Sequence, residues 1–169
     1  MADTLARLEP VPTEPAAYPG VTVALAPPMR RWSLRARDPK LLEKAIGRKV
    51  PRTIGETLDG IACLGPDEWL WRSAEGVPAG MAEGQPVSIV DVSERSVAFR
   101  IEGPLARAAL NAGCPRDLER FAVGQTRRTV YEGVEIILHR AGEEQWTAEV
   151  WRSFAEWFWL SLNAAAAHP

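Results

Sequence analysis

The chain has 169 residues, 46% of them hydrophobic and 25% charged, and its formal net charge is −2. These values are ordinary for a globular domain with a substantial core, and they argue against wholesale disorder. So small a net charge gives no general attraction for phosphate backbones, and no apolar run approaches the roughly 20 residues that span a bilayer. We therefore expect neither a nucleic-acid partner nor a membrane partner.

Residues 1–20 predict an extended N-terminal arm. They contain four prolines and little apolar periodicity, unlike a segment that packs into a core. Acids and prolines also stand where a secretory signal would have its apolar stretch, so we expect a cytoplasmic protein. Residues 21–169 are expected to form a single domain.

A strand and a helix are predicted directly after the arm. "WSLRAR" at 32–37 alternates apolar and polar residues, which is typical of a half-buried strand. "DPKLLEKAIG" follows, with Asp38 as the N-cap, Pro39 at the first helical position and Gly47 as the stop. These signals predict a short amphipathic helix.

The stretch "LGPDEWLW" predicts a hairpin. Its strands are expected at 58–65 and 68–73, joined by a Gly-Pro-Asp turn. Because strand side chains alternate between faces, the two tryptophans of this stretch share one face, packed inward. The two adjacent acids do not share a face, so we expect Asp67 in the turn and Glu68 facing water, not a catalytic pair.

Further strands and helices alternate irregularly over the rest of the chain. The strands are expected at 86–93, 96–103, 125–131, 134–140 and 145–151, with a short polar link at Glu94-Arg95 and a two-residue hairpin turn at Glu132-Gly133. The helices are expected at 103–113 and 153–167. The last helix begins with Ser153 and Glu156 at the spacing of a capping box. This order lacks the strict alternation of a parallel sheet, so it predicts an α+β fold of mostly antiparallel sheets with helices packed on them.

The C-terminal helix is apolar around nearly its whole circumference. One apolar stripe runs from Phe154 to Ala165, and further aromatic residues project elsewhere. Such a helix is either sandwiched between sheets or docked in part on another protein, and the sequence leaves both open. The candidate partner-interface residues are Trp151, Phe154, Trp157, Trp159 and Leu160.

No residue is predicted to be catalytic, cofactor-binding or metal-ligating. Asp91 ends an apolar run, where a carboxylate usually forms local hydrogen bonds, and its neighbours supply no obvious catalytic partner. The only cysteines, Cys63 and Cys114, form no Cys-x-x-Cys pair, and the two histidines, His139 and His168, lie apart from them. The glycine spacings of phosphate-binding loops are also absent.

Four stretches together resemble the gamma subunit of heterotetrameric sarcosine oxidase. They are "SLRA" at 33–36, "LGPDEWLW" at 64–71, "VDVSERSVAFRIEGPLARAALNAGCPRDL" at 90–118 and "RSFAEWFWLSL" at 152–162. The third stretch also resembles, more distantly, the folate-binding aminomethyltransferase superfamily that includes the glycine-cleavage T protein. The shared residues there are Asp91-Val92-Ser93, Gly103-Pro104-Leu105-Ala106 and, imperfectly, Gly124-Gln125-Thr126.

The resemblance implies two ferredoxin-like halves and a place in a four-subunit oxidoreductase. In that family the complex oxidatively demethylates sarcosine to glycine, with hydrogen peroxide and a tetrahydrofolate-bound one-carbon unit as products. The resemblance further implies that FAD, FMN, NAD, tetrahydrofolate and zinc are bound by other subunits. The gamma chain would then be a non-catalytic, structural partner of the alpha, beta and delta subunits, chiefly of alpha.

Two alternatives remain open. The chain could be a free-standing folate-binding aminomethyltransferase-like protein with Asp91 at the chemistry. It could also be a scaffold for some other amine-oxidising complex, which would differ only in its partners.

Overall fold

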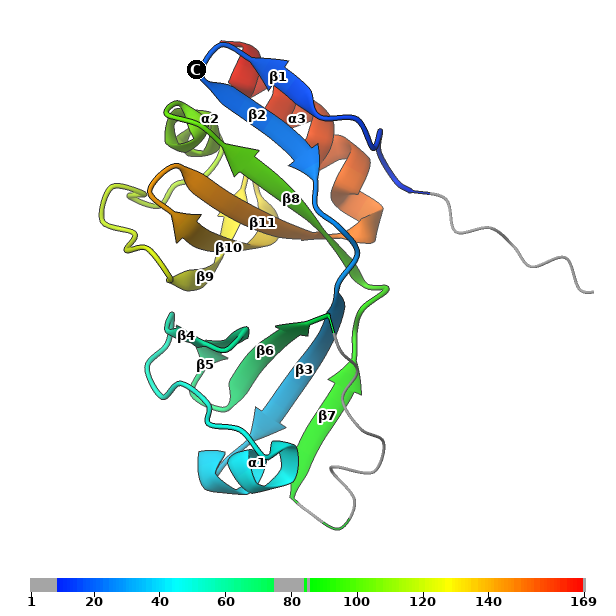
Figure 1. Cartoon of the computed structure of the whole chain (residues 1–169), viewed down its shortest axis with the longest axis vertical. Helices are drawn as coiled ribbons and strands as arrows, with labels where there is room; N and C mark the ends of the chain where they lie inside the picture. The colour runs from blue at the N-terminus through cyan, green and yellow to red at the C-terminus, as the bar shows by residue number, and fades with distance from the viewer. Residues whose placement is uncertain (1–8, 75–83, 85, 169) are drawn as a thin grey trace, which may run out of the picture.

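The computed structural model describes residues 9–74, 84 and 86–168. The described chain forms two lobes, an upper and a lower one in Figure 1, each built on one antiparallel sheet. The prediction of an α+β fold with mostly antiparallel sheets is confirmed. No described helix combines the length and the apolar character needed to cross a bilayer.

The upper lobe is a six-stranded sheet with two helices packed on one face (Figure 1). In spatial order its strands are β1 (Ala16–Tyr18), β2 (Val21–Leu25), β8 (Ser96–Glu102), β11 (Gln145–Trp151), β10 (Val134–Gly142) and β9 (Thr126–Tyr131). Its helices are α2 (Ala106–Asn111) and α3 (Ala155–Ala167), and the 3-10 turn η1 (Arg152–Phe154) joins β11 to α3.

The lower lobe is a five-stranded sheet with one helix. In spatial order its strands are β4 (Thr57–Leu58), β5 (Ile61–Gly65), β6 (Glu68–Ser73), β3 (Arg30–Ala36) and β7 (Val87–Asp91), and its helix is α1 (Pro39–Ile46). In this lobe β3 lies between β6 and β7, and α1 follows it. In the upper lobe β8 lies between β2 and β11, and α2 follows it. This is the split arrangement of a ferredoxin-like unit, so the prediction of two ferredoxin-like halves is confirmed.

Each sheet has one apolar face and one mixed face, as the period-two alternation of its strands requires. The apolar face of the upper sheet packs on α2 and α3, where Phe99 lies 5.3 Å from Phe158 between ring centroids. The apolar face of the lower sheet packs on α1, and there Trp32 lies 5.5 Å from Trp71. Each such buried side chain contributes about 1.5–3 kcal/mol to stability.

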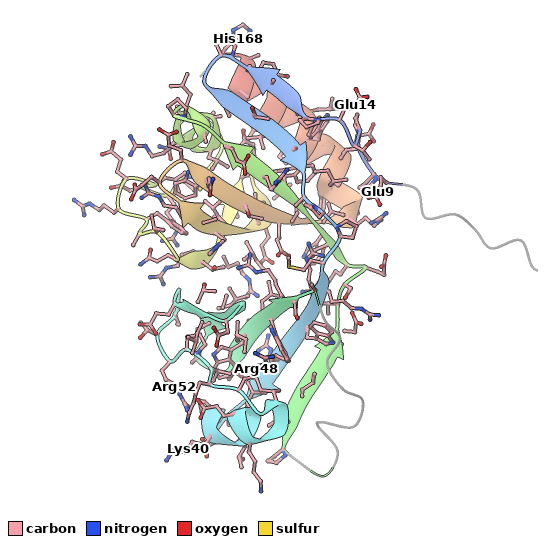
Figure 2. The ribbon with its side chains drawn as sticks, in the orientation of Figure 1. Glu9, Glu14, Lys40, Arg48, Arg52 and His168 are labelled. Carbon is pink, nitrogen blue, oxygen red and sulfur yellow. The ribbon has the colours of Figure 1, made fainter. Side chains whose placement is uncertain are left out.

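The hairpin prediction for "LGPDEWLW" is confirmed, with both tryptophans in the lower core. Trp69 is 1% exposed, and its indole N–H donates to the Pro51 carbonyl oxygen at 2.8 Å. Trp71 is covered from outside by Arg48, labelled in Figure 2, whose guanidinium carbon lies 5.4 Å from the ring centroid. Both rings therefore fill the core of the lower lobe and are not available as a surface site.

The two predicted helix starts have different outcomes. At α1, Asp38 caps the helix by accepting from the Lys40 N–H at 2.9 Å, and Gly47 ends it at φ 66°, as predicted. At α3 the predicted Ser153 cap is wrong. The 3-10 turn η1 already includes Ser153, the N-cap position falls on Phe154, and no side chain caps it.

One predicted strand is divided in the structure, and one predicted link joins two different sheets. The strand expected at 58–65 is divided by a tight Asp59-Gly60 turn, with φ values of 47° and 79°, into β4 and β5. The strands expected at 86–93 and 96–103 are both present, but the link at Glu94-Arg95 connects the two lobes, because β7 pairs with β3 in the lower lobe whereas β8 belongs to the upper sheet. By contrast, the predicted Glu132-Gly133 hairpin turn is confirmed, at φ 44° and 87°.

Part of the predicted N-terminal arm belongs to the upper lobe. Residues 1–8 lie outside the described residues. Val11 is only 7% exposed, and β1 pairs with β2 while two of its side chains pack against the upper core. The expectation that the arm stays outside the core is therefore wrong for these residues, because edge-strand pairing satisfies their backbone groups. The single domain at 21–169 stays a prediction, and it contains two separate cores.

Candidate functional site

An exposed aromatic patch lies where the chain passes from β11 into α3. We define the aromatic patch as four side chains that share a high exposure for their type. They are Trp151 (46% exposed), Phe154 (42%), Trp157 (38%) and Leu160 (62%). Singly exposed apolar residues are normal on a protein surface, but several large exposed apolar side chains within one short segment are typical of an interaction site.

The patch is exposed because the other side of α3 is already used by the core. The buried residues of α3 follow helical spacing, which turns the remaining apolar side chains outward. These buried residues are Ala155, Phe158, Trp159, Leu162 and Ala166. The outward Trp157 keeps one contact within the chain, an edge contact with Tyr131 at 6.5 Å between ring centroids.

Four of the five predicted partner-interface residues form this patch, and one does not. Trp159 is only 8% exposed, and its ring lies 6.0 Å from that of Phe99 in the upper core. It sits one residue from the buried Phe158 and four from the buried Ala155, so the helical period turns it inward. Trp159 is therefore a core residue of this chain. The interface role of the other four stays a prediction.

The mixed faces of the two sheets meet in a polar contact that we call the inter-lobe seam. It consists of the pairs Arg31–Glu149, Arg72–Glu149, Glu68–Arg128 and Thr57–Thr126, each of which joins one lobe to the other. The backbone takes part as well, because the Thr126 N–H donates to the Gly55 carbonyl oxygen at 2.9 Å.

The centre of the seam is a buried ion pair. Arg31 Nε donates to Glu149 Oε2 at 2.7 Å, and the two side chains are only 5% and 3% exposed. Arg72 Nη1 lies 3.8 Å from the other oxygen of the same carboxylate. Burial, and secondarily repulsion from Arg31, lowers the pKa of Arg72, while Glu149 opposes that shift. A guanidinium stays protonated at any ordinary pH, so two cations share this one anion.

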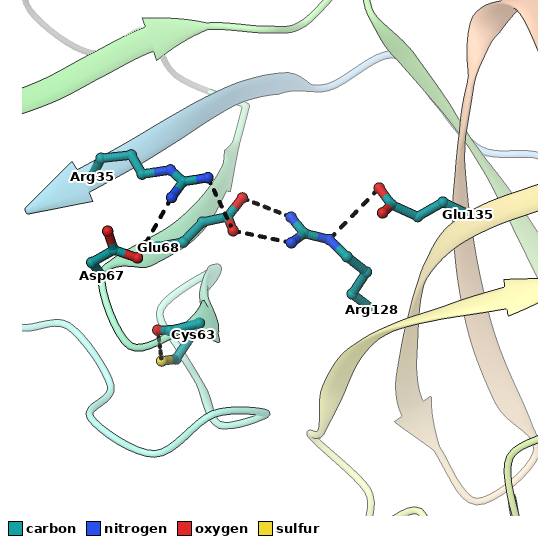
Figure 3. Close-up of polar contacts among 7 residues, drawn as sticks. Arg35, Cys63, Asp67, Glu68, Arg128 and Glu135 are labelled. Atoms are coloured by element: carbon teal, nitrogen blue, oxygen red, sulfur yellow. Dashed lines mark hydrogen bonds and ion pairs between the residues drawn. The ribbon is translucent and has the colours of Figure 1, made fainter.

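A second ion pair closes the seam at the hairpin of the lower lobe. Both Glu68 oxygens accept from Arg128, at 2.6 and 3.0 Å, and Arg35 approaches the same carboxylate at 3.3 Å (Figure 3). The hydrogen bonds from Arg128 lower the pKa of Glu68. The prediction that Glu68 faces water is wrong, because its side chain is 14% exposed and tied to the opposite lobe. Its neighbour Asp67 is 50% exposed, as a turn residue should be.

His139 lies beside the ion pairs as a neutral ring. Burial, and then the nearby Arg72, lowers its pKa to about 4. Its Nδ1 lies 3.0 Å from the Gln125 carbonyl oxygen and 2.9 Å from Thr126 Oγ1. A carbonyl can only accept, so Nδ1 carries the proton and Nε2 is left as an acceptor. The ring therefore adds no charge to the seam near neutral pH.

Asp91, the one catalytic alternative, is held in local hydrogen bonds. Its Oδ1 accepts from the backbone N–H and the hydroxyl of Ser93, and its Oδ2 pairs with Arg30 at 3.1 Å. These contacts, those from Ser93 first, lower its pKa and so keep it a weak base. Asp91 and Ser93 also line a surface cavity of about 530 Å³ with Arg30.

The cysteines are both buried. Burial raises the pKa of the Cys63 thiol, which donates to the Gly65 carbonyl oxygen at 3.3 Å. Cys114 is 4% exposed and lies 3.8 Å from the Thr129 hydroxyl oxygen. Among the described residues no group of three or more histidine, cysteine and acidic side chains is placed to hold a metal ion.

The residues of the buried ion pair at the centre of the seam were not singled out by the sequence. Arg31, Arg72 and Glu149 each occupy the polar position of an alternating strand, which ordinarily predicts a solvent-facing side chain. One available signal was Glu149, a lone acid between the apolar Ala148 and Val150. That pattern alone does not show whether the polar face of the strand is buried against another sheet or exposed to solvent.

A family model described as "Sarcosine oxidase, gamma subunit family" matches residues 41–168. A sarcosine oxidase subunit gamma from Arthrobacter sp is 33% identical over 119 residues, which make up 62% of this chain and 58% of the relative. One from Corynebacterium sp. (strain U-96) is 31% identical over 128 residues, 68% of this chain and 62% of the relative. The chain thus spans about three-fifths of the length of these two relatives.

Two solved structures share the fold. A chain of the heterotetrameric sarcosine oxidase from Corynebacterium sp. U-96, in complex with pyrrole 2-carboxylate, matches with a TM-score of 0.80 and 28% identity, over 92% of this chain and 88% of that one. The glycine cleavage system aminomethyltransferase T from Bartonella henselae matches with a TM-score of 0.66 and 14% identity, over 85% of this chain and 45% of that one, which shows a shared fold alone. Because the family model covers well over half of the chain, including β11, η1 and α3, the chain belongs to the sarcosine oxidase gamma subunit family.

Proposed function

We propose that this chain is the gamma subunit of a heterotetrameric sarcosine oxidase and that it acts there as a structural, non-catalytic subunit. The complex would oxidatively demethylate sarcosine to glycine, with hydrogen peroxide and a tetrahydrofolate-bound one-carbon unit as products. The redox and folate cofactors, FAD, FMN, NAD and tetrahydrofolate, and the zinc would be held by the alpha, beta and delta subunits. The proposal also keeps the expectation of a cytoplasmic protein.

The observation that carries the proposal is the aromatic patch. Four large apolar side chains stand exposed on the C-terminal segment that the family model includes. Aromatic residues at the centre of a protein interface supply most of its binding energy when a partner excludes water from them. We propose that the alpha subunit is the chief partner that covers this patch.

A structural role also agrees with how the acidic side chains are used. Glu68 and Glu149 form ion pairs that hold the two lobes together, and Asp91 accepts a hydrogen bond from the nearby Ser93. A general base needs a pKa near the working pH, whereas the pKa values of Glu68 and Asp91 are lowered by their partners. These contacts favour a structural role for the acidic side chains over a role in catalysis.

The test is reconstitution with the alpha, beta and delta subunits. The double variant Trp151→Ser/Leu160→Ser should bind the alpha subunit at least roughly thirtyfold more weakly, because losing about 2 kcal/mol is typical of an interface centre. Val90→Ser is the matched control, since Val90 is 51% exposed but lies on β7 in the lower lobe and is not part of the patch. Binding is measured by co-purification and by calorimetry.

Two results would count against the proposal. One is a wild-type chain that stays monomeric and indifferent to the other subunits. The other is a patch variant that co-purifies as well as Val90→Ser does.

The free-standing folate-binding alternative has one observation in its favour, the cavity of about 530 Å³ beside Asp91. It predicts that the isolated chain binds tetrahydrofolate and that Asp91→Asn abolishes aminomethyltransferase activity. Calorimetric titration of the isolated chain with tetrahydrofolate decides between the two. Tight binding would favour the alternative, and its absence would remove it.

A further inference from the structure

A second cavity, of about 340 Å³, lies where the two lobes meet. Its walls come from the β2–β3 connection, from β3, β6 and the β4–β5 turn of the lower lobe, and from β8, β10 and β11 of the upper lobe. This volume lies near the lower end of the roughly 300–1,000 Å³ range of small-molecule sites. The cavity therefore has room for a small ligand.

The charged side chains that line this cavity are unbalanced. Its described lining has three guanidiniums, one carboxylate and the neutral imidazole of His139. The guanidiniums are those of Arg31, Arg72 and Arg100, and the carboxylate is that of Glu149. The cavity lining is therefore net positive near neutral pH.

The excess positive charge lies among the nearly buried side chains of the cavity, where water screens it least. Glu149 is bound to Arg31 at 2.7 Å, whereas its distance to Arg72 is 3.8 Å, longer than a hydrogen bond. All three side chains are nearly buried, with Arg72 at 11% exposed. A buried cation without its own anion is costly, so a second negative charge beside Arg72 would be favourable.

The remaining lining is mostly small and apolar. Pro27 and Met29 are exposed at the rim together with Arg100, while Ala98 is 6% exposed and lies deeper. Such a wall fits a short aliphatic body and excludes a large one. Charge and shape together therefore select one class of ligand.

We propose that the cavity between the lobes is a binding site for a small aliphatic carboxylate, whose anionic head pairs with Arg72 beside the Arg31–Glu149 ion pair. The guanidinium fork of Arg72 matches the geometry of a carboxylate. Arg100 adds positive charge at the rim. This site is separate from the aromatic patch and does not rest on the proposed assembly.

The test uses the full chain at pH 7.5 and ligand-observed NMR titrations with acetate and butyrate, against sodium chloride at matched ionic strength. Both carboxylates should bind saturably, and butyrate up to about tenfold more tightly, because two further methylenes enter the apolar part. Arg72→Gln should weaken butyrate binding at least tenfold. Arg100→Gln, at an exposed rim position, should weaken it several-fold.

Two further variants separate the site from general stability. Arg128→Gln removes another inter-lobe guanidinium that does not line the cavity, so it should leave butyrate affinity unchanged. Glu149→Gln frees both buried guanidiniums, so butyrate should bind it at least fivefold more tightly and should raise its Tm more than that of the wild type. If Arg72→Gln does not fold, Arg100→Gln and Glu149→Gln decide the question.

The proposal is overturned if the NMR titration of the wild type with butyrate does not saturate, or if sodium chloride at matched ionic strength gives the same response. It is equally overturned if Arg100→Gln and Arg128→Gln have the same affinity, or if Glu149→Gln shows neither tighter binding nor a larger shift in Tm.

Discussion

The inter-lobe seam and the aromatic patch depart from the usual distribution of residues in opposite directions. In the seam, Arg31 and Glu149 are charged yet 4% and 3% exposed, whereas in the patch Trp151 and Leu160 are apolar yet 46% and 62% exposed. Charged side chains are almost never fully buried unless paired, and large exposed apolar groups mark contact sites. The charged residues of the seam therefore need partners, and the proposed function gives the patch a partner as well, but the two regions differ in where that partner comes from.

The seam finds its partners within the chain, because the mixed face of each sheet supplies charge to the other. Within the described part of the chain no sheet faces the patch, and the opposite side of α3 is covered by the upper core. The comparison teaches that the seam is a matter of stability, which is testable on the isolated chain. The patch concerns assembly only under the proposed function, which is testable only with other subunits present.

Breaking the buried ion pair should have the largest effect on stability. Glu149→Ala leaves Arg31 buried without its anion, so we expect the free energy of unfolding to fall by about 3–5 kcal/mol. Urea unfolding followed by tryptophan fluorescence measures this change. The double variant Arg31→Met/Glu149→Leu should lose less than Glu149→Ala does. A single-variant loss under 1 kcal/mol would show that the pair does not hold the seam.

Protonation of His139 should weaken the seam by a smaller amount. The folded pKa of about 4 lies below the unfolded value near 6.5, so the unfolded state binds the proton more tightly. The contribution of His139 is therefore full above pH 6.5 and is lost as the pH falls toward 4. Between pH 7.5 and 5 we expect a loss of about 2 kcal/mol in urea unfolding. His139→Gln should flatten this dependence; an unchanged slope would contradict the assignment.

The smallest expected loss of stability comes from Glu68, and the adjacent acid Asp67 should contribute even less. Glu68→Gln breaks the bidentate pair with Arg128, so we expect unfolding to become easier by about 1 kcal/mol. Asp67→Asn is the matched control, because its side chain is 50% exposed and should change stability by less than about 0.5 kcal/mol. Equal losses in the two variants would mean that the position of Glu68 in the seam is unimportant.

Local signals predicted most of the elements and missed how they combine. The Asp38 cap, the Gly47 stop and the Glu132-Gly133 turn depend on residues near in sequence, so their chemistry was visible in the chain itself. The Ser153 cap failed because the 3-10 turn η1 includes Ser153, so that the N-cap position of α3 falls on Phe154. Likewise, the face of α3 that points outward depends on which of its side chains pack into the upper core.

The sequence by itself determined the alternation of the strands, the apolar helices and the membership of a family, because each depends on the order and spacing of residues. The tertiary structure alone decided that the polar faces of two sheets meet each other instead of water. Glu68 and Glu149 have the sequence signature of surface residues, and their partners Arg128 and Arg31 lie 60 and 118 positions away. Pairing at such separations is set by the docking of whole sheets, which no local pattern records.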